Sequence, residues 1–195
     1  MNITKFPSYE WKPRTLTEIY AHQSEELIRI YADGVYDLFH PGHVEQFKQI
    51  KAAFPNVYLI IGVCSDSATL KYKGCLPVMN ERERLKMINQ CRYVDEAYLS
   101  PPFFPTMEFV NHLKVDLVAH DALPYNSPTA SDCYAIFKAC DRFFETLRTP
   151  TISTTSLLDR IIKDLERYKQ RQLIQLTRKG ISKLLFLKFK IVKRQ

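Results

Sequence analysis

The sequence contains no run of 18 consecutive apolar residues, so it predicts no membrane-spanning helix. Its first residues, MNITKFPSYEWKPR, lack the apolar core of a secretory signal. Internal repeats and low-complexity segments are also absent from the sequence. At 195 residues, with 46% hydrophobic and 25% charged residues, the composition is typical of one folded domain. We therefore expect a folded protein in the cytoplasm.

Cysteine is scarce, and its spacing excludes two common uses. The chain has five cysteines, which is an odd number, and no Cys-x-x-Cys pair. Most of them lie inside apolar segments, so neither a disulfide framework nor a zinc site is indicated. We expect reduced, mostly buried thiols, and the sequence predicts no set of protein ligands for a metal ion.

Acidic residues are absent from residues 167–195, which carry ten Lys or Arg. The other 18 basic residues compare with 21 acidic ones, so residues 1–166 are mildly acidic although the whole chain has a net charge of +7. A mildly acidic body argues against a nucleic-acid partner. We divide the chain into an N-terminal extension at 1–26, a folded domain at 27–166 and a basic tail at 167–195.

Apolar strand-like runs alternate with helical patterns through the folded domain. Continuous apolar runs predict buried strands at 27–31, 57–63 and 115–119, with weaker candidates at 94–99 and 143–147. Helical patterns occupy 42–54, 80–91, 131–139 and 155–168. This alternation predicts an α/β fold, a Rossmann-like doubly wound parallel sheet of about five strands followed by a basic C-terminal helical tail. Ligands of such folds bind at the carboxyl ends of the strands.

One candidate binding motif lies where the first predicted strand leads into the first helix. Asp33 and Gly34 end the strand, and His40-Pro41-Gly42-His43 opens the helix, whose N-terminus attracts anions. Pro41 suits a first turn, and Gly42 would let a ligand approach the backbone. Imidazoles donate hydrogen bonds to phosphoryl oxygens and can carry positive charge near neutral pH. The bare pattern also arises by chance, so two exposed or capping histidines are the alternative.

The stretch YADGVYDLFHPGH resembles the signature of the cytidylyltransferase family, part of the wider HxGH nucleotidyltransferase group. Further segments resemble later family motifs in the same order: VCSDSATLKYKG (63–74), RYVDE (92–96), VAHD with PY (118–125) and RTPTISTT (148–155). The resemblance covers roughly residues 27–165 and is strongest to the phosphocholine branch of the family. It implies an enzyme whose catalytic domain is 27–166 and which transfers CMP from CTP to phosphocholine, giving CDP-choline and pyrophosphate. It also implies a homodimer that forms through the Arg92–Glu96 region.

The resemblance assigns roles to individual residues. His40 and His43 would stabilise the α-phosphate and the transition state, and Lys73, on a mobile-looking loop with Gly74, would reach the phosphates of both substrates. Lys71 could assist, although a solvated lysine is the simpler interpretation. Arg92 would contact the triphosphate, although an arginine before a strand is more often surface decoration. The remaining residues implied to bind CTP are Asp37, Gly42, Asp66, Arg148, Thr149, Ser153 and Thr154.

A quaternary ammonium cannot donate hydrogen bonds, so aromatic faces and nearby carboxylates must hold it. The resemblance implies a phosphocholine site made of Asp33, Phe103, Asp121, Tyr125 and Tyr134. Phe103 stands where the family has tryptophan, and Thr151 stands where the family has glycine in its R-T-x-G-I-S-T motif. The tyrosines could instead be ordinary half-buried aromatic residues. Phosphoethanolamine and glycerol 3-phosphate are alternative acceptors.

Mg²⁺ is expected to accompany CTP, because phosphate oxygens can supply most of its ligands. In the tail, apolar residues recur at spacings of three and four between basic residues, which predicts an amphipathic helix interrupted at Gly180. Such a segment can contact anionic membranes or pack on the body of the protein. A non-catalytic membrane-binding protein is therefore a further alternative. The apolar residues that recur at these spacings are Leu173, Leu176, Ile181, Leu184 and Leu185.

Overall fold

The computed structural model describes residues 11–22, 26–128 and 130–178. These residues form two compact units, which divide after Ile152. The first unit therefore comprises the described residues up to 152, and the second comprises 153–178. This division lies before the boundary that the charge distribution placed at residue 166.

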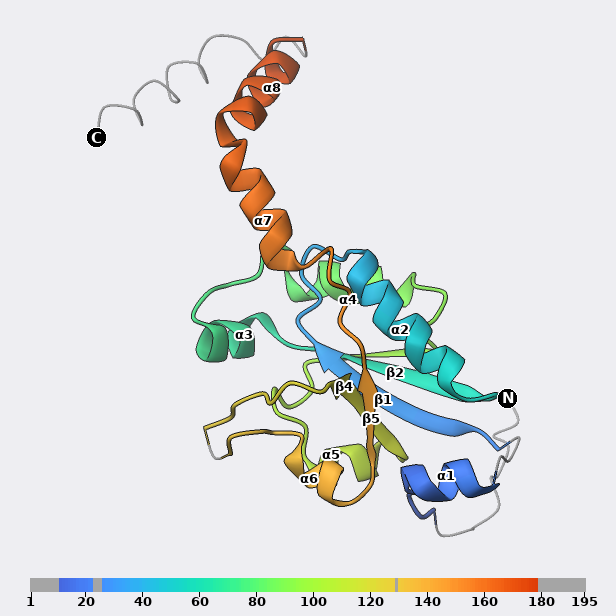
Figure 1. Cartoon of the computed structure of the whole chain (residues 1–195). Helices are drawn as coiled ribbons and strands as arrows, with labels where there is room; N and C mark the ends of the chain where they lie inside the picture. The colour runs from blue at the N-terminus through green and yellow to red at the C-terminus, as the bar shows by residue number, and fades with distance from the viewer. Residues whose placement is uncertain (1–10, 23–25, 129, 179–195) are drawn as a thin grey trace, which may run out of the picture. The chain divides into compact units, whose positions relative to one another are not determined.

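The first unit is built on a five-stranded sheet in the order β3-β2-β1-β4-β5 (Figure 1). Every neighbouring pair is parallel, which confirms the predicted sheet. The first strand continues beyond the apolar run at 27–31 and ends at Gly34, as predicted, so Asp33 is its penultimate residue. The strands are β1 (Ile28–Gly34), β2 (Val57–Val63), β3 (Glu96–Leu99), β4 (Leu117–Asp121) and β5 (Phe143–Thr146).

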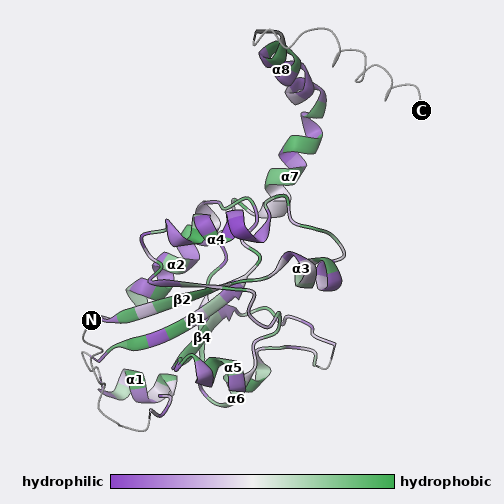
Figure 2. Cartoon of the chain, turned by 180° about the vertical axis from the view of Figure 1, so that it is seen from behind, coloured by the Kyte–Doolittle hydropathy of each residue, from purple (hydrophilic) through white to green (hydrophobic). Residues whose placement is uncertain are grey.

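Helices cover both faces of this sheet (Figure 1). On one face, Phe47 of α2 and Ile88 of α4 pack against Ile30 in β1. On the other face, Val110 of α5 and Phe137 of α6 belong to the core that contains Tyr31. Neighbouring residues of β1, such as Ile30 and Tyr31, are accordingly both buried, and much of this strand is coloured as hydrophobic in Figure 2. The helices of this unit are α1 (Leu16–His22), α2 (Pro41–Ala53), α3 (Asp66–Lys73), α4 (Glu81–Asn89), α5 (Met107–His112) and α6 (Ala135–Ala139).

Several helices differ from the sequence-based prediction. Helices α1, α3 and α5 were not predicted, because each has six to eight residues and buries one side chain. Helix α6 begins at Ala135 and not at 131, because the Asp132 carboxylate accepts the backbone N–H groups of Tyr125 and Tyr134 and so forms a turn. Among the predicted strands, 57–63 has the bounds of β2, whereas 115–119 begins and ends two residues before β4.

Buried arginine and aspartate side chains hold the amino ends of the strands together. Asp116 is 2% exposed and accepts the Arg14 guanidinium at 2.9 Å, which attaches the segment before α1 to the sheet. Arg142 is also buried and donates to the carbonyl oxygens of Asp116 and Val115 at 2.9 and 2.6 Å. These contacts lie before β4 and β5, so they stabilise the fold at the edge opposite the carboxyl ends of the strands.

The five cysteines are free thiols. Cys64 is buried, but Cys75 and Cys140 are exposed, so the expectation of buried thiols is wrong for these two. Both cysteines lie in connections, where the neighbouring apolar residues are exposed or alternate with charged residues. Among the described residues, no helix has the length and apolar character needed to cross a membrane.

The second unit contains α7 (Thr154–Lys163) and α8 (Leu165–Arg178). The single helix predicted at 155–168 is therefore wrong, because α7 ends at Lys163 with Asp164 as its C-cap, and a new helix begins at Leu165. Ile161, Ile162 and Leu165 are exposed apolar residues in this unit. Leu173 and Leu176 lie in α8, whereas Gly180, Ile181, Leu184 and Leu185 lie outside the described residues.

Candidate active site

The predicted site residues of the first unit follow the carboxyl ends of several strands. Asp33 lies at the end of β1, Asp121 at the end of β4, and Arg148 shortly after β5. Because β1 pairs with β2 and β4 in parallel, the residues that leave these strands emerge at one edge of the sheet. The motif that contains the two histidines leaves β1 at the same edge.

The loop between β1 and α2 has an unusual backbone. Tyr36 and Leu38 have φ angles of 55° and 48°, in the left-handed region that non-glycine residues rarely adopt. Each costs on the order of 1–3 kcal/mol, so surrounding contacts must hold the loop. Asp37, predicted to contact CTP, accepts the backbone N–H groups of Leu38, Val78 and Met79 at 2.8–3.0 Å. Its carboxylate therefore fixes this loop to the connection between α3 and α4.

The two histidines are held by the backbone of the turn that they flank. His40 is the N-cap of α2, and its Nδ1 accepts the backbone N–H of Gly42 at 3.1 Å. His43 Nδ1 accepts the backbone N–H of His40 at 3.3 Å. A backbone N–H can only donate, so each Nδ1 is unprotonated and each neutral ring carries its proton on Nε2. The site therefore offers two imidazole N–H donors.

Burial keeps both rings neutral. It lowers the pKa of His40, and together with the neighbouring His40 ring it lowers the pKa of His43 to about 3. Of the two properties considered for these imidazoles, hydrogen-bond donation is therefore the one that the free protein offers near neutral pH. The backbone N–H of Gly42 is also occupied by His40, so a phosphate at this turn would meet Nε2–H groups first.

The protein's own groups pack closely against Gly42. A Cβ at this position would lie 3.0 Å from the His40 ring and 3.2 Å from the carbonyl oxygen of Ile152. The space that we assigned to a ligand near the backbone is therefore filled by these two groups. The contact also brings the segment from Arg148 to Ile152 against the histidine turn. A role for Gly42 in binding CTP stays a prediction.

Lys73 is the last residue of α3, not part of a loop. Gly74 ends the helix in the left-handed region with φ 78°, and its N–H donates to the Leu70 carbonyl oxygen at 3.0 Å. The Lys73 ammonium lies 6.0 Å from the centre of the Tyr125 ring, whereas Lys71 lies over Tyr72. Only Lys73 is thus directed toward another predicted site residue.

Four aromatic rings form a connected group beside Lys73. Phe103 packs on Tyr72 with ring centres 4.8 Å apart, and Phe104 contacts Tyr72 at 4.9 Å and Tyr125 at 6.4 Å. We define Tyr72, Phe103, Phe104 and Tyr125 as the aromatic group. Of these four residues, only Phe103 and Tyr125 were predicted to belong to the site. The aromatic pair FF at 103–104 was the available signal for Phe104, whereas Tyr72 between two lysines offered none.

Asp33 is a buried carboxyl without an ion-pair partner among the described residues. Burial raises its pKa to about 7, although the Tyr134 hydroxyl donates to its Oδ1 at 3.1 Å and opposes the shift. Tyr134 is itself 3% exposed, and its ring stacks on His120 at 4.4 Å. Tyr134 therefore supports Asp33 and presents no open ring face in this conformation.

Asp121 forms an ion pair with Arg148, with Nε 3.0 Å from Oδ2. Its Oδ1 accepts the backbone N–H of Leu123 at 3.0 Å. The structure thus joins a predicted acceptor residue with a predicted CTP residue, and Thr149 lies half-buried beside them. His120, in the VAHD segment, was not predicted to have a role. Its ring stacks on Tyr134, and its Nδ1 lies 3.9 Å from Oδ1 of Asp121.

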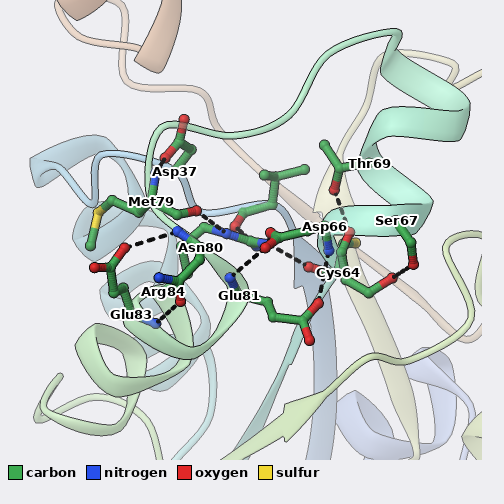
Figure 3. A network of polar contacts seen from close by, with 12 residues as sticks. Asp37, Cys64, Asp66, Ser67, Thr69, Met79, Asn80, Glu81, Glu83 and Arg84 are labelled. Atoms are coloured by element: carbon green, nitrogen blue, oxygen red, sulfur yellow. Dashed lines mark hydrogen bonds and ion pairs between the residues drawn. The ribbon is translucent and has the colours of Figure 1, made fainter.

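Asp66 and Arg92 differ from their predicted surroundings. The Asp66 carboxylate is engaged by Arg84 and by the backbone N–H of Glu81 (Figure 3). Arg92 is exposed in the connection that enters β3, and its described contact is with Tyr93 at 2.8 Å. That connection lies at the amino end of its strand, so the structure does not bring Arg92 to the histidines. The catalytic role of Arg92 and the CTP contact of Asp66 stay predictions.

Ser153 is the N-cap of α7, and its side-chain oxygen accepts the backbone N–H of Ser156 at 3.0 Å. Ser153 and Thr154 belong to the second unit, so their predicted contact with CTP stays a prediction. Thr151 is not among the described residues with positive φ. Threonine at the family's glycine position therefore adopts an ordinary backbone conformation here.

The parallel sheet with helices on both faces defines a Rossmann-like α/β domain, with the paired histidines at its carboxyl edge. Residues 31–160 match a family model described as Cytidylyltransferase-like. The chain therefore belongs to the cytidylyltransferase-like family.

Three relatives illustrate the similarity. Choline-phosphate cytidylyltransferase A of Homo sapiens is 46% identical over 149 residues, which cover 76% of this chain and 40% of that protein. Choline-phosphate cytidylyltransferase 2 of Arabidopsis thaliana is 45% identical over 152 residues, or 77% of this chain and 50% of that protein. Ethanolamine-phosphate cytidylyltransferase of Mus musculus is 35% identical over 146 residues, which cover 73% of this chain and 36% of that protein. The chain thus spans half or less of the length of these relatives.

Proposed function

We propose that this chain transfers CMP from CTP to phosphocholine, giving CDP-choline and pyrophosphate for phosphatidylcholine synthesis. The observation that carries the proposal is the pair of neutral histidines, which present two Nε2–H donors at the carboxyl edge of the sheet. The family membership supports the same reaction class.

In this reaction, a phosphate oxygen of phosphocholine forms a bond to the α-phosphorus of CTP. The bond between that phosphorus and the bridging oxygen of the β-phosphate breaks, and pyrophosphate leaves with its electron pair. No covalent intermediate with the protein is needed, so the residues act by positioning and by stabilising charge. His40 and His43 donate to the α-phosphate, and Lys73 stabilises the negative charge of both substrates.

The acceptor site favours a quaternary ammonium. The aromatic group offers ring faces, and Asp33 and Asp121 supply carboxyl groups at the neighbouring ends of β1 and β4. The greater identity to the relatives named for choline than to the one named for ethanolamine supports this choice. Phe103 is a weaker cation–π partner than the tryptophan of the family, so Tyr125 carries more of the contact.

Mg²⁺ is proposed to arrive bound to CTP, where it neutralises phosphate charge. Among the residues that the structure describes, no three His, Cys, Asp or Glu side chains are grouped to hold a metal ion. Triphosphate oxygens would therefore supply most of its ligands, which suits a small cation that retains several waters.

We further propose that the protein acts in the cytoplasm as a homodimer through the Arg92–Glu96 region and that the basic tail contacts anionic membranes. The amphipathic character of α8 and the exposed Ile174 support the membrane contact. Removal of residues 169–195 should then weaken sedimentation with anionic vesicles and leave CTP turnover in solution largely unchanged. Equal sedimentation of both proteins would contradict the membrane role.

An acceptor assay tests the proposed function. CTP turnover should be faster at low acceptor concentration with phosphocholine than with phosphoethanolamine or glycerol 3-phosphate. Tyr125→Ala should weaken phosphocholine binding by ~0.5–2 kcal/mol, and Phe103→Trp should keep or strengthen it. A preference for phosphoethanolamine would contradict the choline assignment, and an absence of turnover with all three acceptors would contradict cytidylyl transfer.

A further inference from the structure

Helix α3 places Lys73 beside the aromatic group, but hydrophobic packing does little to hold it. Of its eight residues only Thr69 is buried, and Leu70 is 47% exposed. The contact of Tyr72 with Phe103 and Phe104 holds the last turn. The first turn has no comparable apolar contact, so its position depends on polar groups.

A fully buried arginine supplies one of those polar contacts and joins it to the sheet (Figure 3). Arg84 lies in α4 and donates to the carbonyl oxygens of Val35 at 2.5 Å and Cys64 at 2.9 Å. These two acceptors directly follow β1 and β2, so they belong to the rigid end of the sheet. The guanidinium is thereby fixed against the body of the domain.

The same guanidinium holds the segment that contains α3 at two points. It pairs with Oδ1 of Asp66, the first residue of α3, at 2.6 Å. It also donates to the carbonyl oxygen of Met79, which lies in the connection after α3, at 3.0 Å. Asp37, in the loop between β1 and α2, accepts the backbone N–H of Met79 at 2.9 Å. The segment between residues 66 and 79 is therefore attached at both ends.

Glu81 adds a second attachment of the first turn of α3. Its carboxylate accepts the backbone N–H of Asp66 at 2.9 Å, and its own N–H donates to the Asp66 carboxylate at 3.1 Å. Glu83, two residues further in α4, caps Asn80 instead and has no described contact with α3. The chain thus offers one glutamate that holds α3 and a neighbouring glutamate that does not.

We propose that Arg84 is a positioning residue, which attaches α3 to the ends of β1 and β2 and thereby places the Lys73 ammonium relative to His40 and His43. This inference rests on the proposed cytidylyl transfer. Arg84 touches no substrate, since it is 0% exposed. Its role requires four acceptors in a fixed geometry, which the planar guanidinium satisfies and a lysine ammonium, with three donors, does not.

The test is a double-mutant cycle between Arg84→Lys and Lys73→Ala, measured as kcat/KM for CTP at a temperature where circular dichroism shows all variants folded. Arg84→Lys should lower kcat/KM by about 10- to 100-fold, because a misplacement of ~1 Å has effects of this order. In the Lys73→Ala background the same change should cost less than about threefold. Its effect on the unfolding midpoint should be equal in both backgrounds.

Arg142→Lys is the matched control, because Arg142 is a buried arginine with several acceptors at the opposite end of the strands. It should lower the unfolding midpoint without changing kcat/KM. Equal losses of activity for Arg84→Lys in both Lys73 backgrounds would overturn the proposal. A loss in Arg142→Lys as large as in Arg84→Lys would also overturn it.

If Arg84→Lys does not fold, substitutions of Glu81 and Glu83 test the role of Arg84 and its partners in placing α3. Glu81→Ala should lower kcat/KM severalfold, and this loss should disappear in the Lys73→Ala background. Glu83→Ala should keep kcat/KM although it weakens the same helix start. Equal activities of the two glutamate variants would overturn the proposal. Wild-type turnover, measured in the same assay, separates this failure from a failure of cytidylyl transfer itself.

Discussion

The imidazole rings of His40 and His43 stack with their centres 3.7 Å apart and their planes at 21°. Each ring accepts a backbone N–H on Nδ1, so protonation there would break a hydrogen bond of the turn. A positive charge on one ring would also lie directly against the other ring. The pair is therefore a rigid, neutral donor site, and its formation has consequences for stability.

His43 should make the fold sensitive to acid. Its pKa is about 3 in the folded protein and near 6.5 when unfolded, so between these values the unfolded chain binds more protons. The stabilising contribution is present above pH 6.5 and is lost as the pH falls toward 3. The difference in unfolding midpoint, His43→Gln minus wild type, should therefore be more positive at pH 5 than at pH 7.5. The exposed His22→Gln is the control, and an identical pH dependence in both variants would contradict this assignment.

Asp33 should act in the opposite direction. Its pKa is about 7 in the folded protein and near 3.8 when unfolded, so between these values the folded chain binds more protons. The stability that its neutral form provides is lost as the pH rises through about 7. Asp33→Asn should therefore raise the unfolding midpoint relative to wild type at pH 8 more than at pH 5. A uniform shift at both pH values would rule out the buried neutral carboxyl.

The same titration should control the acceptor. A quaternary ammonium binds the ionised form of Asp33, so phosphocholine affinity should increase as the pH rises from 6 to 8. In Asp33→Asn the affinity should be lower and nearly independent of pH in this interval. Calorimetric titration in two buffers of different ionisation enthalpy should also detect proton release by wild type at pH 7. Binding without proton release would contradict the linkage.

Tyr36 is 4% exposed, and its hydroxyl has no hydrogen-bond partner among the residues that the structure describes. An unpaired buried hydroxyl is unfavourable, so Tyr36→Phe should raise the free energy of unfolding by about 1 kcal/mol. The ring contact with His43 at 5.2 Å would remain. Tyr134→Phe, which loses the hydrogen bond to Asp33, is the contrasting variant and should lower stability. Denaturant titrations of both variants test the difference.

Lys73 and Lys71 differ in direction, so their substitution should differ in effect. Lys73→Ala should weaken CTP binding and reduce kcat, because it removes a cation from the phosphate site. Lys71→Ala, on the same helix with the same charge change, should have a much smaller effect on both. Small and equal effects of the two substitutions on steady-state kinetics would indicate that both lysines are solvated surface residues without a role in binding CTP.

Local patterns predicted the sheet and the histidine turn, because continuous apolar runs and a helix N-cap are signals carried by neighbouring residues. The contacts that organise the site were hidden from such patterns. Tyr134 reaches Asp33 across 101 positions of sequence. Arg84 lies within NERERLK, where a run of charges normally indicates a solvated surface and gave no sign of a buried guanidinium. Helix α3 was missed because it buries a single side chain.

The most direct test of the central claim uses CTP labelled in its α-phosphate, with phosphocholine as acceptor. Wild type should transfer the label into CDP-choline and release one pyrophosphate for each product. His40→Ala and His43→Ala should each lower kcat by about 100- to 1000-fold while the far-ultraviolet circular dichroism stays that of wild type, because each loses a donor directed at the developing charge. Unlabelled product from wild type, or near-normal rates in both folded variants, would contradict the account.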